Sequence, residues 1–226
     1  LTYDLAAAAT ETKAFTAYGA VTKVVKKGTG ALTVQPANTD FNGTIDIEKG
    51  VFAAGTTDNT QTTVLGTATI TVKGGAQFRS NQTCKQQGKY FTGCKIFAEG
   101  AGPDGKGAIV FNGGELGDNL IRHLHLTGDA SIGGTGRFGV GYWGFLYLDG
   151  HTLTGLNNEY YFRDIRATAD HAGHFVKKGG SVTFQRGDHQ TYLKGSAENT
   201  FTLDNAQLTI WSGVDLEVLW TLKLLA

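Results

Sequence analysis

Residues 45–52 read Ile-Asp-Ile-Glu-Lys-Gly-Val-Phe, and this stretch indicates the fold of the chain. Apolar and polar residues alternate before the glycine, and a second short apolar alternation follows it. Residues 70–78, Ile-Thr-Val-Lys-Gly-Gly-Ala-Gln-Phe, repeat the pattern. Alternation with a period of two is typical of a strand with one buried face, and glycine allows tight turns with positive φ. The stretch therefore predicts a strand, a turn and a second strand.

The same unit recurs along the chain. Its copies begin at Val24, Ile45, Ile70, Ile109, Leu124, Leu146, Phe175 and Phe201. The mean distance between consecutive copies from Ile45 to Phe201 is 26 residues, which is a typical repeat length for a solenoid. We expect an all-β, single-stranded parallel β-helix with about eight rungs, in which Ile45 and Ile47 pack on Ile70 and Val72. A β-sandwich is the structural alternative, but the repeated motif favours the solenoid.

Composition limits the classes of partner. The chain has 226 residues, no formal net charge, 33 glycines and 2 prolines. Neutral charge gives no electrostatic reason to expect nucleic acid or an anionic membrane surface as a partner. No apolar run is long enough for a membrane-spanning helix, so we expect no span. Methionine is absent, and a period-two pattern continues to Leu224, so we interpret residues 1–226 as one β-helix segment of a longer surface or secreted protein.

The N-terminal copies carry a further pattern. It consists of residues 27–34 (Lys-Gly-Thr-Gly-Ala-Leu-Thr-Val), 38–47 (Asn-Thr-Asp-Phe-Asn-Gly-Thr-Ile-Asp-Ile) and 50–52 (Gly-Val-Phe). Together these resemble the autotransporter-associated passenger β-strand repeat, over about residues 21–55 and more weakly over 175–184. The resemblance implies a right-handed β-helix, either extracellular or on the cell surface of a Gram-negative-type bacterium. We expect a glycan or a host or cell-surface protein as the class of partner.

The two cysteines lie in the widest gap between copies, from Ile70 to Ile109. Cys84 and Cys94 are ten residues apart in a polar, glycine-bearing stretch. We expect a local disulfide between them, which would stabilise the fold by about 2–3 kcal/mol and would require an oxidising compartment. Free thiols are the alternative. Zinc needs further ligands, and no histidine lies in this loop.

The histidines gather in one part of the chain, between residues 123 and 189, among several aspartates. They are His123, His125, His151, His171, His174 and His189. A metal cluster is one interpretation, but the pattern matches no zinc-protease motif. We favour surface and turn histidines, and predict no metal site and no cofactor.

Aromatic and charged residues also accumulate after residue 142. Rings beside arginine and aspartate are typical of a sugar-binding face, because a pyranose stacks on a ring while charged groups hold its hydroxyls. The candidate ligand-binding residues are Tyr142, Trp143, Tyr160, Tyr161, Arg163 and Asp164. The alternative is that these rings fill the core or cover the corners of the rungs.

Two classes of function remain. The first is a non-catalytic, structural or adhesive β-helix. The second is a polysaccharide-active enzyme, a lyase or glycoside hydrolase, or its carbohydrate-binding accessory module. Residues 38–40, Asn-Thr-Asp, match one catalytic motif of polygalacturonases, but the other motifs are missing and the passenger repeat also explains these letters. We predict no catalytic residues and favour the first class.

Overall fold

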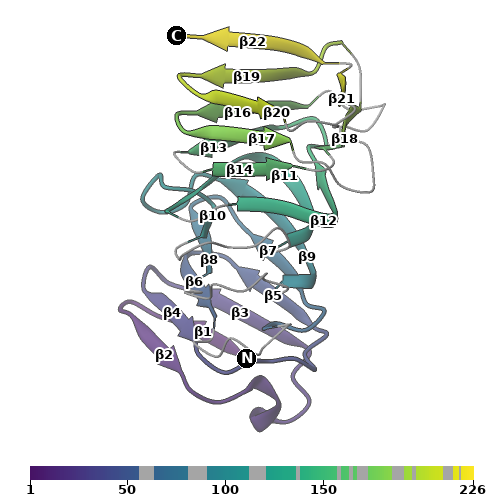
Figure 1. Cartoon of the computed structure of the whole chain (residues 1–226). Helices are drawn as coiled ribbons and strands as arrows, with labels where there is room; N and C mark the ends of the chain where they lie inside the picture. The colour runs from purple at the N-terminus through teal and green to yellow at the C-terminus, as the bar shows by residue number, and fades with distance from the viewer. Residues whose placement is uncertain are drawn as a thin grey trace.

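The computed structural model shows a parallel β-solenoid whose strands stack along one axis from the N-terminus to the C-terminus (Figure 1). It describes residues 1–55, 64–80, 91–111, 121–135, 138–156, 159–162, 165–166, 173–184, 191–194, 197–210, 216–218 and 220–226. Every pairing between the described strands is parallel. The expected all-β parallel solenoid is thus confirmed, whereas a sandwich would pair antiparallel strands.

One ladder of strands runs the whole length of the stack. In order along the axis it contains β1 (Thr2–Asp4), β3 (Lys23–Lys27), β5 (Thr44–Ile47), β7 (Thr69–Val72), β9 (Phe91–Gly100), the first half of β11 (Ile121–Gly134), β12 (Phe138–Tyr147), β15 (Ile165–Arg166), β18 (Thr191–Lys194) and β21 (Leu216–Val218). We call it the first ladder.

The second ladder lies across the corner from the first. It contains β2 (Ala9–Glu11), β4 (Ala31–Val34), β6 (Gly50–Ala54), β8 (Ala76–Ser80), β10 (Ile109–Phe111), the second half of β11, β13 (Thr152–Leu156), β16 (His174–Lys178), β19 (Thr200–Asp204) and β22 (Thr221–Leu225). Counted over the described residues, each ladder has ten strands. The rung count therefore differs from the eight expected, because β1, β2 and β22 belong to none of the sequence copies.

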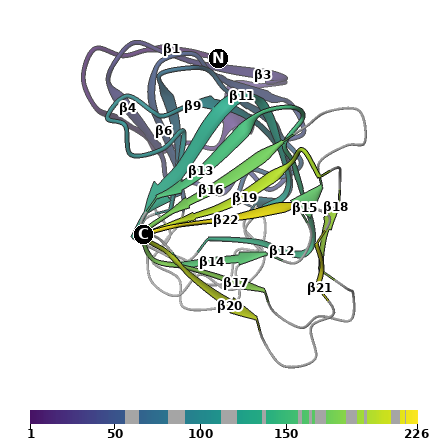
Figure 2. The same cartoon turned by 90° about the horizontal axis from the view of Figure 1, so that it is seen from above.

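A third ladder begins midway along the chain. It starts where Phe91 of β9 pairs with Ile121 of β11, and it continues through β12 to β14 (Glu159–Phe162), β17 (Ser181–Phe184) and β20 (Gln207–Ile210). Seen along the axis, the C-terminal half has three groups of strands, one on each side (Figure 2). The rungs thus gain a third strand-bearing side as the chain proceeds.

The core consists of inward residues stacked in register. Ile45 lies against Ile70, and Ile47 against Val72, as the repeat predicts, and all four side chains are fully buried. Burying one such side chain stabilises a fold by about 1.5–3 kcal/mol. Aromatic residues form a second column inside the stack, in which the ring of Phe78 lies 6.3 Å from that of Phe52 and 5.1 Å from that of Phe91.

A short 3-10 helix, η1 (Phe15–Tyr18), packs at the N-terminal end of the stack (Figure 1). The Phe15 ring is fully buried and meets Phe41 edge to face, with centroids 5.2 Å apart. Its amide donates to Asn38 Oδ1 across 2.6 Å. At the opposite end β22 is exposed along its whole length. The two ends of the stack therefore differ in how much apolar surface they leave in contact with solvent.

Two lysines occupy inward positions, where the alternation calls for apolar residues. Lys26 in β3 and Lys177 in β16 are both fully buried. The ammonium of Lys26 donates to the carbonyls of Lys27 (2.6 Å), Gly28 (2.9 Å) and Lys49 (3.1 Å). Lys177 donates in the same way to Lys178 and Gly179. Each lysine thus reaches from the core to a corner and donates to carbonyl oxygens of the turn.

Lys177 gives the fold a pH dependence. Burial lowers the pKa of Lys177 from 10.5 to about 8. Between these values the unfolded chain holds the proton and the folded chain has lost it, so the free energy of unfolding should rise as the pH increases. Urea titrations between pH 8 and 10.5 should show a smaller rise in Lys177→Met than in the parent chain. An equal rise in both proteins would contradict the assignment.

The expected disulfide is not formed at Cys94. This cysteine is a free thiol, fully buried in the core, with Sγ 3.8 Å from Leu65 O and 3.7 Å from Gly66 O. Burial raises the pKa of the thiol to about 12. Cys84 lies outside the described residues. The prediction placed Cys94 in a polar excursion, whereas it belongs to an inward position of β9 and packs as a small apolar side chain.

Candidate functional site

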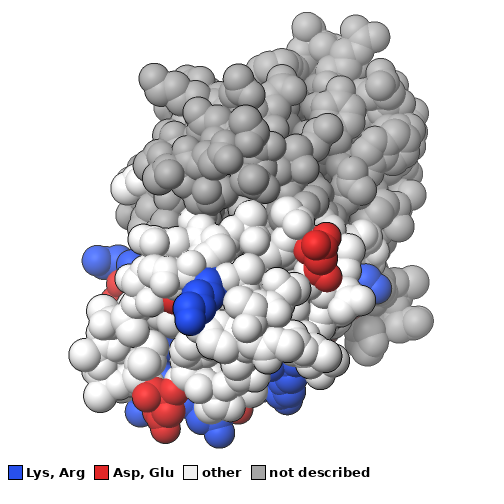
Figure 3. All heavy atoms as spheres, turned by 90° about the horizontal axis from the view of Figure 1, so that it is seen from below, with Lys and Arg blue, Asp and Glu red and all other residues white. Residues whose placement is uncertain are grey.

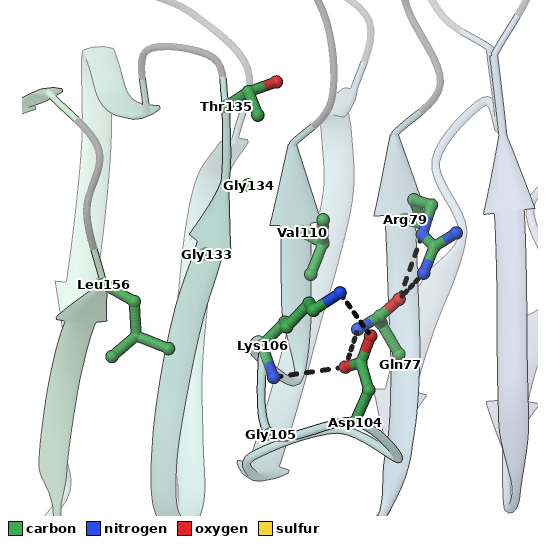
Figure 4. Close-up of a pocket in the computed structure, with 10 residues that line it drawn as sticks. All are labelled: Gln77, Arg79, Asp104, Gly105, Lys106, Val110, Gly133, Gly134, Thr135 and Leu156. Atoms are coloured by element: carbon green, nitrogen blue, oxygen red, sulfur yellow. Dashed lines mark hydrogen bonds and ion pairs between the residues drawn. The ribbon is translucent and has the colours of Figure 1, made fainter.

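A groove lies on the outer surface of the second ladder, across β8, β10, β11 and β13 (Figure 4). Its volume is about 670 Å³. The lining residues come from these strands and from the loop at residues 101–108. They are Gln77, Arg79, Asp104, Gly105, Lys106, Val110, Gly133, Gly134, Thr135 and Leu156. The groove therefore combines charged, apolar and side-chain-free positions, a mixture that is typical of small-molecule sites.

Gln77 organises the polar end of the groove. Its side chain is fully buried, and Nε2 donates to Gly107 O at 2.9 Å and to Asp104 Oδ1 at 3.4 Å. Its Oε1 accepts hydrogen bonds from Nε (3.0 Å) and Nη2 (2.5 Å) of Arg79. Moving the Gln77 side chain would break its buried hydrogen bonds and cost free energy. Gln77 therefore fixes the orientation of the Arg79 guanidinium at the rim of the groove.

The fixed guanidinium retains unused donors. Arginine has five N–H groups, and Gln77 accepts from two of them. Among the described residues no carboxylate forms an ion pair with Arg79. Within the described part of the chain, both Nη1 hydrogens and one Nη2 hydrogen have no acceptor and can serve a ligand. Two parallel N–H donors on a rigid plane match the geometry of a carboxylate.

The loop at residues 101–108 supplies the second charged group. The Asp104 carboxylate accepts a hydrogen bond from the Lys106 amide at 3.1 Å, and its other oxygen lies 3.9 Å from the Lys106 ammonium. The Lys106 side chain is 77% exposed, so this ion pair is loose. The loop is bound to β8, because its Gly107 carbonyl accepts a hydrogen bond from Gln77 Nε2. Arg79, Lys106 and Asp104 together leave one net positive charge.

Glycines form the floor between the two ends. A Cβ on Gly133 would lie 1.9 Å from Lys106 O, and one on Gly134 would lie 2.0 Å from Phe111 O. No side chain fits at either position, so the loop and β10 approach β11 closely. Val110 and Leu156 add apolar surface, and Leu156 lies at the end away from Arg79 (Figure 4). The backbone of Lys106 and Phe111 thus occupies the space that side chains at these two positions would take.

The ligand-binding residues predicted from the sequence lie elsewhere. Tyr142 and Trp143 belong to β12, and Tyr160 and Tyr161 belong to β14, which pairs with β12 through Phe138↔Tyr160 and Gly139↔Tyr161. The structure thus brings the two strands together and describes their backbone. Arg163 and Asp164 lie outside the described residues. The ligand-binding role of these six residues stays a prediction.

Sequence reasoning missed the groove. The stretch Pro103-Asp104-Gly105 is a turn signal that directly precedes β10, and it lies in the widest gap between the copies. That gap was assigned to the expected cysteine loop. The outward positions Gln77 and Arg79 could not be singled out, because only the folded loop brings Asp104 beside them.

Histidine and aromatic side chains form a column on the first ladder. Phe97, His125 and Tyr147 are register neighbours on β9, β11 and β12. The His125 ring lies 4.8 Å from Phe97 and 4.1 Å from Tyr147, nearly parallel to both. Because each face of the imidazole is covered, His125 offers no free face to a sugar. His125 Nδ1 also lies 3.4 Å from Asp149 Oδ2. The described part of the chain contains no group of three or more metal-ligating side chains.

Comparison with known proteins gives no relative. No family model, curated protein or solved structure matches the chain. The resemblance to the passenger repeat therefore stays a prediction. Over the described residues, the structure contains no helix that is long and apolar enough to cross a membrane. The proposal about function therefore rests on the fold and on the groove.

Proposed function

We propose that the chain is a non-catalytic structural and adhesive β-solenoid of an extracellular or bacterial cell-surface protein. The two continuous ladders support this proposal most directly. Each rung packs on the next through buried side chains and backbone hydrogen bonds, so the stack acts as a stiff scaffold. A stiff scaffold suits a protein that presents a binding surface away from its anchor.

The outer surface near the N-terminus supports the same proposal. Lys23 of β3 pairs with Asp46 of β5 at 2.7 Å, and Lys27 pairs with Glu48 at 3.6 Å. These side chains complement their neighbours on adjacent rungs. Seen from the N-terminal end, Lys, Arg, Asp and Glu are scattered singly among other residues, with both signs interspersed (Figure 3). This region therefore serves the scaffold, and the groove is the part of the surface built for contact.

The surface localisation rests on the repeat. Residues 21–55, which resemble the passenger repeat, include four strands, β3 to β6, joined by two tight turns. A short strand-turn-strand unit on each rung is what the resemblance implies. We propose display by a Gram-negative-type bacterium on this ground, with a glycan or a host or cell-surface protein as partner.

In one respect the groove supports the second class of function, a polysaccharide-active enzyme or its carbohydrate-binding module. A polysaccharide-active module needs a groove that can hold a sugar chain, and the groove over β8 to β13 crosses four successive strands of one ladder. Glycoside hydrolysis usually requires two carboxyl groups on opposite sides of the bond. Asp104 is the carboxylate among the described lining residues, and it is bound to Gln77 and Lys106. We therefore propose binding without hydrolysis at this groove.

Incubating the whole chain with a panel of polysaccharides tests the proposal. We expect retention of the chain on at least one immobilised glycan, with no new reducing ends and no unsaturated products. Release of either product in proportion to the amount of chain would contradict the non-catalytic assignment. Absence of retention on all glycans and on cell surfaces would contradict the adhesive assignment.

A further inference from the structure

We propose that the groove across β8, β10, β11 and β13 binds an acidic saccharide, with the ligand carboxylate on Arg79 and the sugar chain along the solenoid axis. This inference rests on the adhesive part of the proposed function and names its ligand class. Three features support it: the Arg79 guanidinium, the other lining residues and the direction of the groove.

The free donors of Arg79 indicate that the ligand carries an anionic group. Gln77 Oε1 holds the guanidinium along one edge and leaves three N–H donors free. The rigid fork loses little side-chain entropy when a ligand binds, because Gln77 has already ordered it. A carboxylate can accept from two of these donors in parallel. The Lys106 ammonium adds long-range attraction, since the lining carries one net positive charge.

The other lining residues of the groove indicate that the ligand is a saccharide. Val110 and Leu156 offer small apolar surfaces to the C–H face of a pyranose, within a groove of about 670 Å³. The Asp104 carboxylate can accept from sugar hydroxyls, and the Thr135 hydroxyl can accept from them or donate to them. An acidic peptide would place further carboxylates near Asp104, and like charges repel. A single acid on a hydroxyl-rich ligand fits this lining better.

The order of the strands under the groove indicates the direction of the bound sugar chain. The polar end lies on β8 and the apolar end on β13, with β10 and β11 between them (Figure 4). Adjacent strands are about 4.8 Å apart, so the groove runs for about 14 Å along the axis. This length accommodates a short oligosaccharide that contacts one rung after another. The periodic scaffold and a polymeric ligand would thus share an axis.

Calorimetric titration of the whole chain with a hexuronic acid tetrasaccharide, a tetrasaccharide in which one residue is a hexuronic acid and the other three are neutral, tests the inference. Its carboxyl-reduced form, which keeps the ring and loses the charge, is the matched probe. We expect saturable binding of the acidic form and at least about tenfold weaker binding of the reduced form, as expected when a charge-assisted hydrogen bond is lost. Equal binding of both forms, or binding of neither, would overturn the inference.

Three variants place the ligand in the groove. Arg79→Gln should weaken binding at least about tenfold, whereas Lys73→Gln, which removes the same charge from an exposed position outside the groove, should change it by less than about twofold. Asp104→Asn should strengthen binding, because it removes the repulsive charge and keeps an oxygen for the Lys106 amide. Equal loss in Arg79→Gln and Lys73→Gln would overturn the site.

Two further probes test which class of ligand supplies the negative charge. Tetraglutamate should bind more weakly than the hexuronic acid tetrasaccharide, and tighter binding of the peptide would overturn the saccharide assignment. A sulfated neutral tetrasaccharide should also bind more weakly, because the fork is matched to a planar carboxylate. Failure of all acidic probes, with retention of the chain on other glycans, would reject this inference and leave the proposed function standing.

Discussion

Replacing Lys26 by Met is expected to lower the free energy of unfolding by about 3 kcal/mol. The Met side chain fills a similar volume but cannot donate to the carbonyls of Lys27, Gly28 and Lys49, all of which accept from the Lys26 ammonium. The lysine is fully buried, so water cannot replace it without opening the rung. Urea denaturation followed by circular dichroism measures the change.

The neighbouring lysine provides the control. Lys27 is exposed and pairs with Glu48 at the surface, so Lys27→Met should cost less than about 1 kcal/mol. The two variants remove the same charge from adjacent positions and differ in burial. Equal stability of Lys26→Met and the parent chain would show that the buried ammonium is not needed at the corner.

Replacing Phe78 by Ala is expected to lower the free energy of unfolding by about 3–5 kcal/mol. The ring is fully buried and lies between Phe52 and Phe91 on adjacent rungs. Its removal leaves a cavity inside a stack whose rungs are fixed by backbone pairing on both sides, so the core can collapse only slightly. Thermal and urea unfolding should both show the loss.

Phe97→Ala is the matched control. Phe97 lies on the outer face of β9, half-buried and stacked on His125, so its truncation should cost about 1 kcal/mol. A cost for Phe97→Ala as large as that for Phe78→Ala would contradict the assignment of the inward and outward faces.

The sequence was sufficient to predict the rung near the N-terminus. Period-two alternation places Ile45 and Ile47 on the same face, and the next copy places Ile70 and Val72 against them, as the structure shows. Local pattern succeeds there because a rung has few ways to bury its apolar face except against the neighbouring rung.

The sequence was not sufficient to place each copy on a side of the solenoid. The copies at Val24 and Phe175 are similar in sequence, yet β3 belongs to the first ladder and β16 to the second. A strand-turn-strand unit fits any corner, so the repeat alone does not decide which corner a copy occupies.

The inward lysines and the groove were missed for related physical reasons. Lys26 breaks the alternation, and a sequence pattern counts it as a surface residue until the structure shows the three carbonyls. Gln77, Arg79 and Asp104 come from two segments, and only tertiary contact joins them. The aromatic candidates after residue 142 were selected by composition, which does not report orientation.

Cross-linking of paired cysteines tests the parallel stacking most directly. Thr44 and Thr69 are register partners on β5 and β7, so Thr44→Cys with Thr69→Cys should form a disulfide on mild oxidation, since the Cα atoms of register partners are about 4.8 Å apart. Thr71 pairs with Asp46, two positions farther along, so Thr44→Cys with Thr71→Cys should remain largely reduced. With Cys84 replaced by Ser in both variants, peptide mass mapping without reductant detects the bond. Equal cross-linking of both pairs, or of the second pair alone, would contradict the parallel register.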